Sequence, residues 1–360
     1  MRERCGILPI SDYLKLALRE WWRMSNARPR RRRRHGGAIF VLLLVLAAAL
    51  SLYITLKPGS SDPAASSPPA APTESGDTPG VSASPIVSEN PDTPDPVETP
   101  ETPKFEILDM AEADIGRGDL ILVNPQHEFT IPEDTGNVLI NDYKSASSLL
   151  FDKDAVLPQK TIEAINRMLD DFKAETGLSN VIIYSAFRSL AKQQQIFDDR
   201  VAMYGSREEA NKWAALPGFS EHHTGLAVDF AIYVDQVINT FKGEGAYAWI
   251  TENAHKYGFF LRYKAEKTDI TGTAYEPWHY RYVGVPHAYF IERRGYCYEE
   301  YMEYLMNFKY DGFHLNGYYD GDMYEIYYVR GTQVPVPTDR EYTISGNNID
   351  GFIVTIKNAE

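Results

Sequence analysis

Two short segments of this chain carry residues whose types and spacing suit metal-dependent hydrolysis. The first is Ser220–Asp229, with the sequence SEHHTGLAVD, and the second is Glu276–Arg281, with the sequence EPWHYR. Together they offer imidazoles and a carboxylate for a metal ion, and a second carboxylate three residues before the last imidazole. A catalytic zinc site needs this inventory, because it combines three protein ligands with an open position for water and a nearby base.

The spacing within the first segment leaves its metal-binding histidine undecided. His222 and Asp229 are seven residues apart, so a single helical turn does not bring them together. Gly225 between them predicts a bend that folds the histidine back over the aspartate. Because neighbouring side chains on an extended chain point to opposite sides, only one of His222 and His223 is expected to face a metal. The residues alone do not choose between the two.

The second segment poses a similar problem of direction. Glu276 and His279 are three residues apart, and such positions on a straight strand face opposite sides of a sheet. Pro277 cannot donate to a strand ladder, so we expect a kink there that turns both side chains inward.

The segment from residue 105 onward alternates helix and strand signals. Apolar spacing predicts a helix over 157–176 that stops at Gly177, and a β-branched run predicts a buried strand over 181–186. No regular βαβ repeat occurs, so we expect an α+β fold. The remaining predicted elements are helices over about 190–204, 206–216 and 246–257, and strands over 227–234, 259–263 and 278–283.

The last fifty residues differ from those before them. Asp-Gly and Asn-Gly pairs mark turns, and strands are expected over 323–329, 341–345 and 351–356. We therefore predict a small β appendage over residues 312–360, packed on a main domain of residues 105–311. Its many tyrosines could stack on sugar rings, but ordinary packing in strands and helices explains them with fewer assumptions.

The two segments, in this order, resemble the Ser-x-His-x-x-Gly-x-Ala-x-Asp and Glu-x-x-Trp-His motifs of the peptidase M15 family, the zinc D,D-peptidases of peptidoglycan. Residues 185–189 (SAFRS) and Gln193 resemble the family's Ser-Gly-Tyr-Arg-Ser segment and its following glutamine. The resemblance covers roughly residues 120–310 and is strongest to the VanY-type D-alanyl-D-alanine carboxypeptidase branch. It implies the hedgehog/DD-peptidase-like fold, in which helices surround a small, mainly antiparallel sheet.

The resemblance also implies a zinc cofactor and its ligands. His222, Asp229 and His279 would bind Zn²⁺. A histidine taken alone is usually a structural or surface residue, and the other six are assigned to that class: His35, His127, His223, His255, His287 and His314.

The remaining site residues would act on the substrate. Glu276 would be the general base of the reaction. Arg188 would hold either the developing oxyanion or the terminal carboxylate of the substrate, since its planar fork suits both. Ser220 and Gln193 are candidates for hydrogen bonds to the peptide, although local turn and helix-surface roles are equally compatible with the sequence.

The implied activity is removal of the C-terminal D-alanine from peptidoglycan stem peptides. The alternatives are an L,D-carboxypeptidase that trims tetrapeptide stems and a non-catalytic, zinc-stabilised wall-binding module. Glu276 argues against the binding module, because a pure binding site needs no base. A dipeptidase acting on free D-Ala-D-Ala is less expected, since such an enzyme belongs in the cytoplasm.

Charge and hydropathy predict that the main domain, residues 105–311, lies outside a cell membrane. Residues 1–36 hold eleven Lys/Arg and three Asp/Glu, and residues 37–56 carry no charge. The uncharged segment is long enough to cross a hydrocarbon core of roughly 30 Å as a helix. The basic run at 30–34 predicts a cytoplasmic N-terminus. The competing interpretation is a cleaved signal peptide, whose apolar core is usually about 7–15 residues long.

Residues 57–104 are rich in Pro, Ser, Thr and acidic residues, so they predict a disordered stalk. We therefore expect a single-pass membrane protein whose catalytic domain faces the cell wall. Cys5 would then lie on the cytoplasmic side of the membrane and Cys297 outside it, so no disulfide within the chain is expected. Peptidoglycan stem peptides and the membrane are the expected partners, and no nucleic-acid partner is expected.

Overall fold

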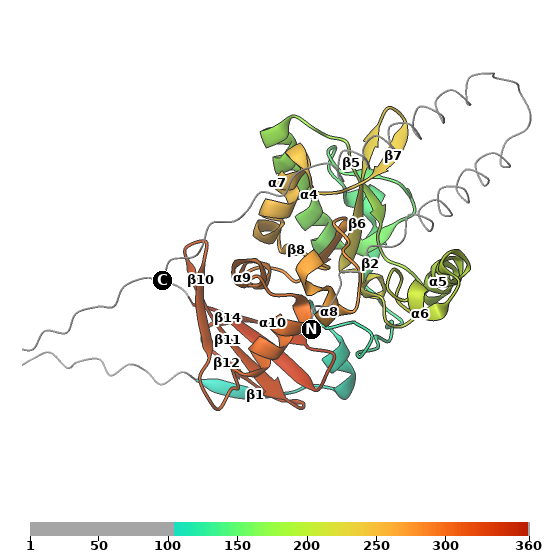
Figure 1. Ribbon diagram of the computed structural model, residues 1–360. Helices are drawn as coiled ribbons and strands as arrows, with labels where there is room; N and C mark the ends of the chain where they lie inside the picture. The colour runs from blue at the N-terminus through green and yellow to red at the C-terminus, as the bar shows by residue number, and fades with distance from the viewer. Residues whose placement is uncertain (1–103, 359–360) are drawn as a thin grey trace, which may run out of the picture. The chain divides into compact units, whose positions relative to one another are not determined.

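The computed structural model describes residues 104–358, which form an α+β domain (Figure 1). The predicted basic tail, membrane helix and nearly all of the predicted stalk lie outside the described residues. Within residues 104–358, no helix is long and apolar enough to span a bilayer.

A small central sheet forms the frame of the domain. Its strand order is β3-β5-β6-β9-β8, and β7 pairs with β6. Only the short β3–β5 pair is parallel, so the sheet is mainly antiparallel, as predicted. The strands are β3 (Leu149–Leu150), β5 (Val181–Ser185), β6 (Ala227–Val234), β7 (Val237–Thr240), β8 (Phe259–Leu261) and β9 (His279–Tyr282).

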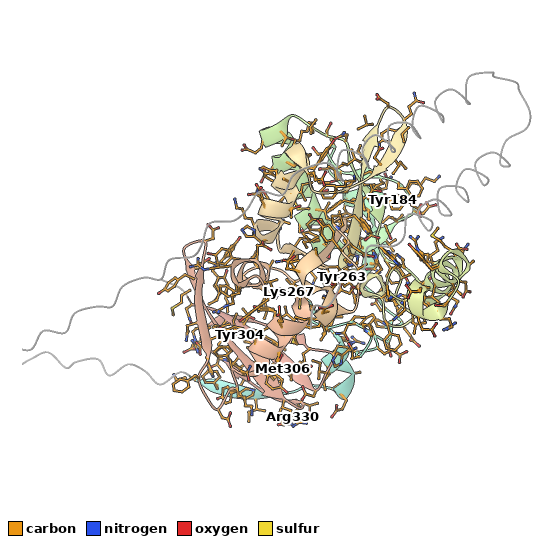
Figure 2. All side chains as sticks on the ribbon, in the orientation of Figure 1. Tyr184, Tyr263, Lys267, Tyr304, Met306 and Arg330 are labelled. Carbon is orange, nitrogen blue, oxygen red and sulfur yellow. The ribbon has the colours of Figure 1, made fainter. Side chains whose placement is uncertain are left out.

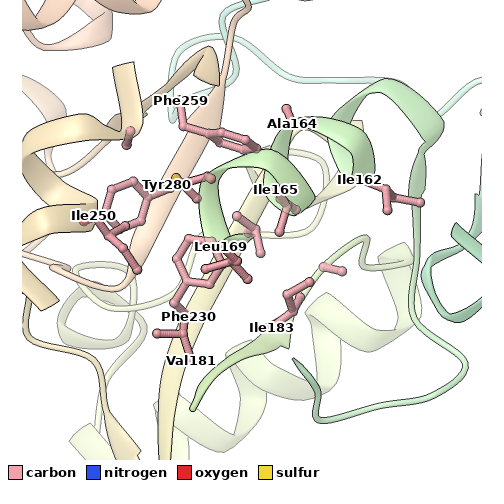
Figure 3. Packing of buried hydrophobic residues seen from close by; sticks show 14 of the residues in the cluster. Ile162, Ala164, Ile165, Leu169, Val181, Ile183, Phe230, Ile250, Phe259 and Tyr280 are labelled. Carbon is pink, nitrogen blue, oxygen red and sulfur yellow. The ribbon is translucent and has the colours of Figure 1, made fainter. Parts of the chain in front are cut away.

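The longest helix, α4 (Gln159–Thr176), packs against this sheet. Its apolar residues recur at helical spacing and are buried, whereas its remaining faces are polar. Gly177 ends the helix in the left-handed conformation, with φ of 74°. Figure 3 shows the resulting core, in which Ile165 and Leu169 of the helix lie near Phe230 and Tyr280 of the sheet.

Of the three remaining predicted helices, one has its expected length and two are shorter. Helix α5 (Leu190–Tyr204) has its predicted bounds, and Ser189 caps it by accepting a hydrogen bond from the amide of Lys192. The helix predicted over 206–216 is the single turn α6 (Arg207–Ala210). The one predicted over 246–257 is α7 (Ala248–Asn253) between two 3₁₀ turns, η3 (Gly245–Tyr247) and η4 (Ala254–Tyr257).

A second sheet occupies the C-terminal part of the domain. It has the antiparallel order β10-β11-β14-β13. A separate pair joins β12 (Gln333–Pro337) to β1 (Phe105–Asp109), so the first described strand is hydrogen-bonded to the C-terminal part of the domain. The sheet strands are β10 (Leu315–Tyr319), β11 (Asp322–Arg330), β13 (Glu341–Gly346) and β14 (Gly351–Asn358).

Two helices connect this sheet to the rest of the domain. Helices α9 (His287–Arg294) and α10 (Tyr298–Met306) share a hydrophobic core with β11 and β14, which includes Tyr301, Ile326 and Ile353. Figure 1 shows α9 and α10 between the C-terminal sheet and the central sheet. The smaller elements are η1 (Glu112–Gly116), β2 (Asn137–Leu139), α3 (Ile140–Tyr143), β4 (Val156–Pro158), η5 (Ala265–Lys267) and α8 (Thr268–Thr271).

The core between α4 and the sheet should dominate the stability of this domain. Leu169 is 1% exposed, so Leu169→Ala is expected to lower the free energy of unfolding by about 2–5 kcal/mol through lost burial and a residual cavity. Leu190→Ala, at a residue that is 47% exposed, is the matched control and should change stability far less. Urea unfolding followed by circular dichroism measures both; equal losses would contradict this assignment of the core.

Candidate metal centre and catalytic site

The register of the central sheet places three functional side chains at adjacent positions on neighbouring strands. Asp229 on β6 lies directly opposite His279 on β9, and Ser185 on β5 lies opposite Asp229 from the other side. His222 joins them from the 3₁₀ turn η2 (Glu221–Thr224), which precedes β6. Segments that are far apart in sequence therefore meet because three strands pair.

The ligand atoms of the three predicted zinc residues converge. Nδ1 of His279 is 3.0 Å from Oδ1 of Asp229, and Nε2 of His222 is 3.2 Å from Oδ2 of the same carboxylate. One ligand atom from each residue lies within 4.8 Å of the others, and all three residues are buried. The two imidazole rings meet edge to face.

The bend predicted at Gly225 is present and requires glycine. The residue ends η2 with φ of 72°, a left-handed conformation that L side chains rarely adopt. A Cβ atom there would lie 2.8 Å from Cδ of Pro158 and 2.7 Å from Oδ1 of Asn137. Backbone strain and a steric clash thus both favour glycine where the chain turns from His222 into β6.

The hydrogen bonds of the two neighbouring histidines distinguish them. His223 contacts the carbonyl of Arg188 through Nδ1, and its Nε2 accepts a hydrogen bond from the amide of Gly218. Both of its ring nitrogens are therefore occupied. His222 contacts the carbonyl of Ala186 through Nδ1, whereas its buried Nε2 forms no hydrogen bond.

This nitrogen lies 3.2 Å from Oδ2 of Asp229 without a hydrogen bond of acceptable geometry, and it is the observation that tests whether a metal fits. A buried polar atom without a partner is costly, and a zinc ion between His222, Asp229 and His279 would satisfy it. Two imidazoles and one carboxylate are also a donor set that catalytic zinc sites use. The residues present therefore fit Zn²⁺, which His222 would bind through Nε2.

Electrostatics hold His222 and Asp229, but not His279, in the protonation states that bind a cation. Burial, together with the positive charge of Arg188, lowers the pKa of His222 to about 4, so its imidazole is neutral at pH 7. Burial opposes ionisation of Asp229, but the neighbouring histidines and Arg188 outweigh it and hold the pKa of that carboxyl well below its usual range. Hydrogen bonds to Asp229 and Glu221 outweigh burial at His279 and raise its pKa to about 9.

Glu276 stands beside the three converging residues. The sequence predicted a kinked strand here, but Glu276 lies in a turn that precedes β9, and its carbonyl accepts a hydrogen bond from the amide of His279. The turn places Oε2 of Glu276 3.8 Å from Nδ1 of His279. Burial raises the pKa of Glu276 to about 7, which is the range that suits a general base.

Arg188 is held at the site by three side chains. It donates from Nε to Ser185, from Nη1 to Gln193 and from Nη2 to Asp229, at 2.9, 3.0 and 2.8 Å. Gln193 is fully buried and its amide also donates to the carbonyl of Ala215. The helix-surface interpretation of Gln193 was therefore wrong. Both polar atoms of this glutamine contact protein, so the structure places it as a support for Arg188.

Two further residues from the sequence motifs lie nearby. Ser220 is buried at the N-cap of η2 but makes no capping hydrogen bond with its side chain. Trp278 is partly buried against the main core, and its carbonyl accepts a hydrogen bond from the amide of Phe230. The hydrogen bond from Ser220 to the peptide stays a prediction.

Sequence reasoning missed three residues that line the far side of His279. The ring of Tyr263, labelled in Figure 2, lies 4.9 Å from that of His279. Glu221 and Arg262 are buried behind the same histidine and form an ion pair. A glutamate directly before a predicted metal ligand was the available signal for Glu221. Nothing in the sequence paired it with an arginine forty-one residues away.

The fold and the site define a zinc D,D-peptidase architecture, and comparisons with known proteins agree. Residues 154–285 match the VanY family model, described as D-alanyl-D-alanine carboxypeptidase. A D-alanyl-D-alanine carboxypeptidase of Enterococcus faecium is 35% identical over 254 residues, which are 69% of this chain and 78% of the relative. One from Enterococcus faecalis is 45% identical over 129 residues, 34% of this chain and 47% of the relative.

A solved structure supports the same assignment. The vancomycin resistance D,D-dipeptidase VanXYg, in complex with a D-Ala-D-Ala phosphinate analogue, matches with a TM-score of 0.63 and 29% identity. The match covers 71% of this chain and all of that one. The chain belongs to the VanY-type D-alanyl-D-alanine carboxypeptidase family and is a peptidase.

The metal assignment can be tested with the two adjacent histidines. His222→Ala removes a ligand and is expected to abolish stoichiometric zinc binding. His223→Gln is the matched control and should retain zinc, because the ring nitrogens of His223 contact only the protein backbone. Metal analysis of both purified variants after dialysis measures the zinc content. Zinc loss from His223→Gln, with zinc retained by His222→Ala, would reverse the assignment.

Proposed function

We propose that this protein is a membrane-anchored, zinc-dependent D,D-carboxypeptidase that removes the C-terminal D-alanine from peptidoglycan stem peptides. The convergence of His222, Asp229 and His279 beside Glu276 is the observation that carries the proposal. The enterococcal carboxypeptidase that is 35% identical over most of its length supports the substrate class.

Zinc held by His222, Asp229 and His279 would lower the pKa of a water molecule and polarise the scissile carbonyl. Glu276 is buried next to these residues, so its carboxylate is placed to accept the proton of the attacking water. The same carboxyl group then delivers that proton to the leaving amine of D-alanine. Its raised pKa makes it a better base than an exposed glutamate and also a competent acid near neutral pH.

Arg188 supplies the positive charge that a C-terminal substrate requires. Its Nη1 and Nη2 each carry a second N–H beyond those that contact Gln193 and Asp229. These N–H groups are available for the terminal carboxylate of the peptide or for the oxyanion that develops at the scissile carbonyl. The bonds to Ser185, Gln193 and Asp229 fix the plane of the guanidinium, which reduces the entropy lost when substrate binds.

The proposed location follows from the N-terminal sequence. The uncharged segment 37–56, preceded by arginines, would anchor the chain with its N-terminus in the cytoplasm. The stalk over 57–104 would let the peptidase domain reach stem peptides outside the membrane. Protease treatment of intact cells tests this arrangement, because the domain should be cleaved while an N-terminal tag stays protected. A domain that is protected until the cells are lysed would contradict it.

The reaction is tested by incubating the purified, zinc-loaded protein with pentapeptide and tetrapeptide stems and analysing the products by mass spectrometry. Loss of one alanine from the pentapeptide alone is expected. Loss from the tetrapeptide alone would indicate an L,D-carboxypeptidase instead. No change to either peptide, with zinc bound, would indicate a binding module.

The assigned base predicts separate effects on metal binding and turnover. Glu276→Gln is expected to retain zinc, because Glu276 is not a ligand, and to lower kcat by about 100-fold or more, because proton transfer is lost. His222→Ala should lose both zinc and turnover. Zinc content and single-substrate kinetics measure the two effects, and full activity of Glu276→Gln would show that the mechanism is wrong.

The pKa of Glu276 predicts how activity depends on pH. The base must be deprotonated, so kcat/KM is expected to fall as the pH decreases through about 7, or somewhat lower because a bound cation favours the carboxylate. The charge of Arg200 also lowers this pKa, so Arg200→Gln should move the acid limb to higher pH. A profile that is flat down to pH 4.5, or a shift to lower pH in the variant, would contradict the assignment.

A further inference from the structure

A buried network of four charged side chains lies directly behind His279. Glu221, Arg262 and Arg281 each have side chains with no exposed surface, and Glu299 of α10 completes the group. Arg262 donates from Nε to Oε1 of Glu221 and from both terminal nitrogens to Glu299. Nη1 of Arg281 lies 3.2 Å from Oε1 of Glu221. The two arginines and two glutamates balance in charge.

One oxygen of this network faces the proposed zinc site. Oε2 of Glu221 is 3.3 Å from Nε2 of His279, while Nδ1 of the same ring faces Asp229 at 3.0 Å. A carboxylate can only accept a hydrogen bond, so Glu221 favours the tautomer with the proton on Nε2. The lone pair of Nδ1 is then directed toward Asp229 and His222.

The two histidines of the site are therefore held in opposite ways. His222 is oriented by a backbone carbonyl through Nδ1 and offers Nε2, whereas His279 is oriented by a side-chain carboxylate through Nε2 and offers Nδ1. A carboxylate partner raises the basicity of an imidazole more than a carbonyl does, and such partners strengthen metal binding.

The rest of the network fixes the position of Glu221. Glu299 also accepts a hydrogen bond from Nδ2 of Asn124, and Arg281 donates to the backbone carbonyls of Asp119 and Ile121. The guanidinium groups of Arg262 and Arg281 lie 5.6 and 5.2 Å from the ring of Tyr298. Glu221 is thereby linked to α10 and to the loop that contains Asp119 and Ile121.

We propose that Glu221 is a positioning residue that sets the tautomer and orientation of His279, and that Arg262 and Arg281 hold it in that role. This inference rests on the zinc site of the proposed function. The competing explanation is that the network is only a structural ion cluster, whose loss would destabilise the fold without acting on the metal.

A pair of substitutions separates these explanations. Glu221→Gln and Glu299→Gln each remove one carboxylate from the same arginine, but only Glu221 contacts His279. Zinc affinity of the detergent-solubilised full-length protein is measured by competition with a chelator, and folding is checked by thermal unfolding. Glu221→Gln is expected to weaken zinc binding by about 10- to 100-fold, and Glu299→Gln by about threefold or less.

The visible absorption spectrum of the cobalt-substituted protein provides a second measurement that does not depend on activity. The spectrum of Glu221→Gln should shift, because the ligand geometry at His279 changes, while that of Glu299→Gln should match the wild type. Equal losses of zinc affinity in both variants, or a wild-type affinity and spectrum in Glu221→Gln, would overturn the inference. A wild-type protein that binds no zinc would instead overturn the proposed function.

If Glu221→Gln does not fold, the wild-type protein still allows a test. Nitrogen-15 NMR of the zinc-loaded protein, labelled selectively at histidine, reports which nitrogen of His279 carries the proton. A proton on Nε2 is expected. A proton on Nδ1 would overturn the inference, because Glu221 would then have no hydrogen to accept.

Discussion

The antiparallel pairing of β6 with β9 is the constraint on which the site depends. It places Asp229 opposite His279, so that a carboxylate and an imidazole fifty residues apart in sequence meet at 3.0 Å. The pairing of β5 with β6 adds Ser185, which holds Arg188 against the same carboxylate. Because strand register changes only in whole residues, a slip of one position would turn these side chains to the opposite face.

Burial of this site makes its charges interdependent. Arg188 on one side and the Glu221 network on the other surround Asp229 and His279 with compensating charges. An isolated ion at this depth would be costly, whereas hydrogen-bonded pairs of opposite charge are tolerated. The same burial raises the pKa of Glu276 to about 7. The environment that strengthens the ion pairs of the site therefore also makes Glu276 a suitable general base.

The C-terminal sheet is integrated with the peptidase core more closely than the idea of an appendage suggests. Residues 105–109 pair with β12, so a strand from the start of the domain belongs to the C-terminal part. Helix α10 packs on β11 and β14 and also carries Glu299, which reaches Arg262 behind the metal centre. The boundary at residue 311 stays a prediction, but packing and hydrogen bonds cross it.

The sequence by itself determined the family, the α+β class and the main helix and strands, because their signals are local: α4 follows from apolar spacing and Gly177, and β6 has its predicted bounds. The resemblance of the sequence motifs to a known family also predicted His222, Asp229, His279 and Glu276 as the site residues, although their spacing alone did not choose between His222 and His223. Only the tertiary structure decided that the ring nitrogens of His223 are occupied by backbone groups, that Gln193 supports Arg188 and that Glu221 faces His279. These relations depend on which strands pair and which side chains share a buried pocket, and such contacts between distant residues leave no periodic pattern in one chain.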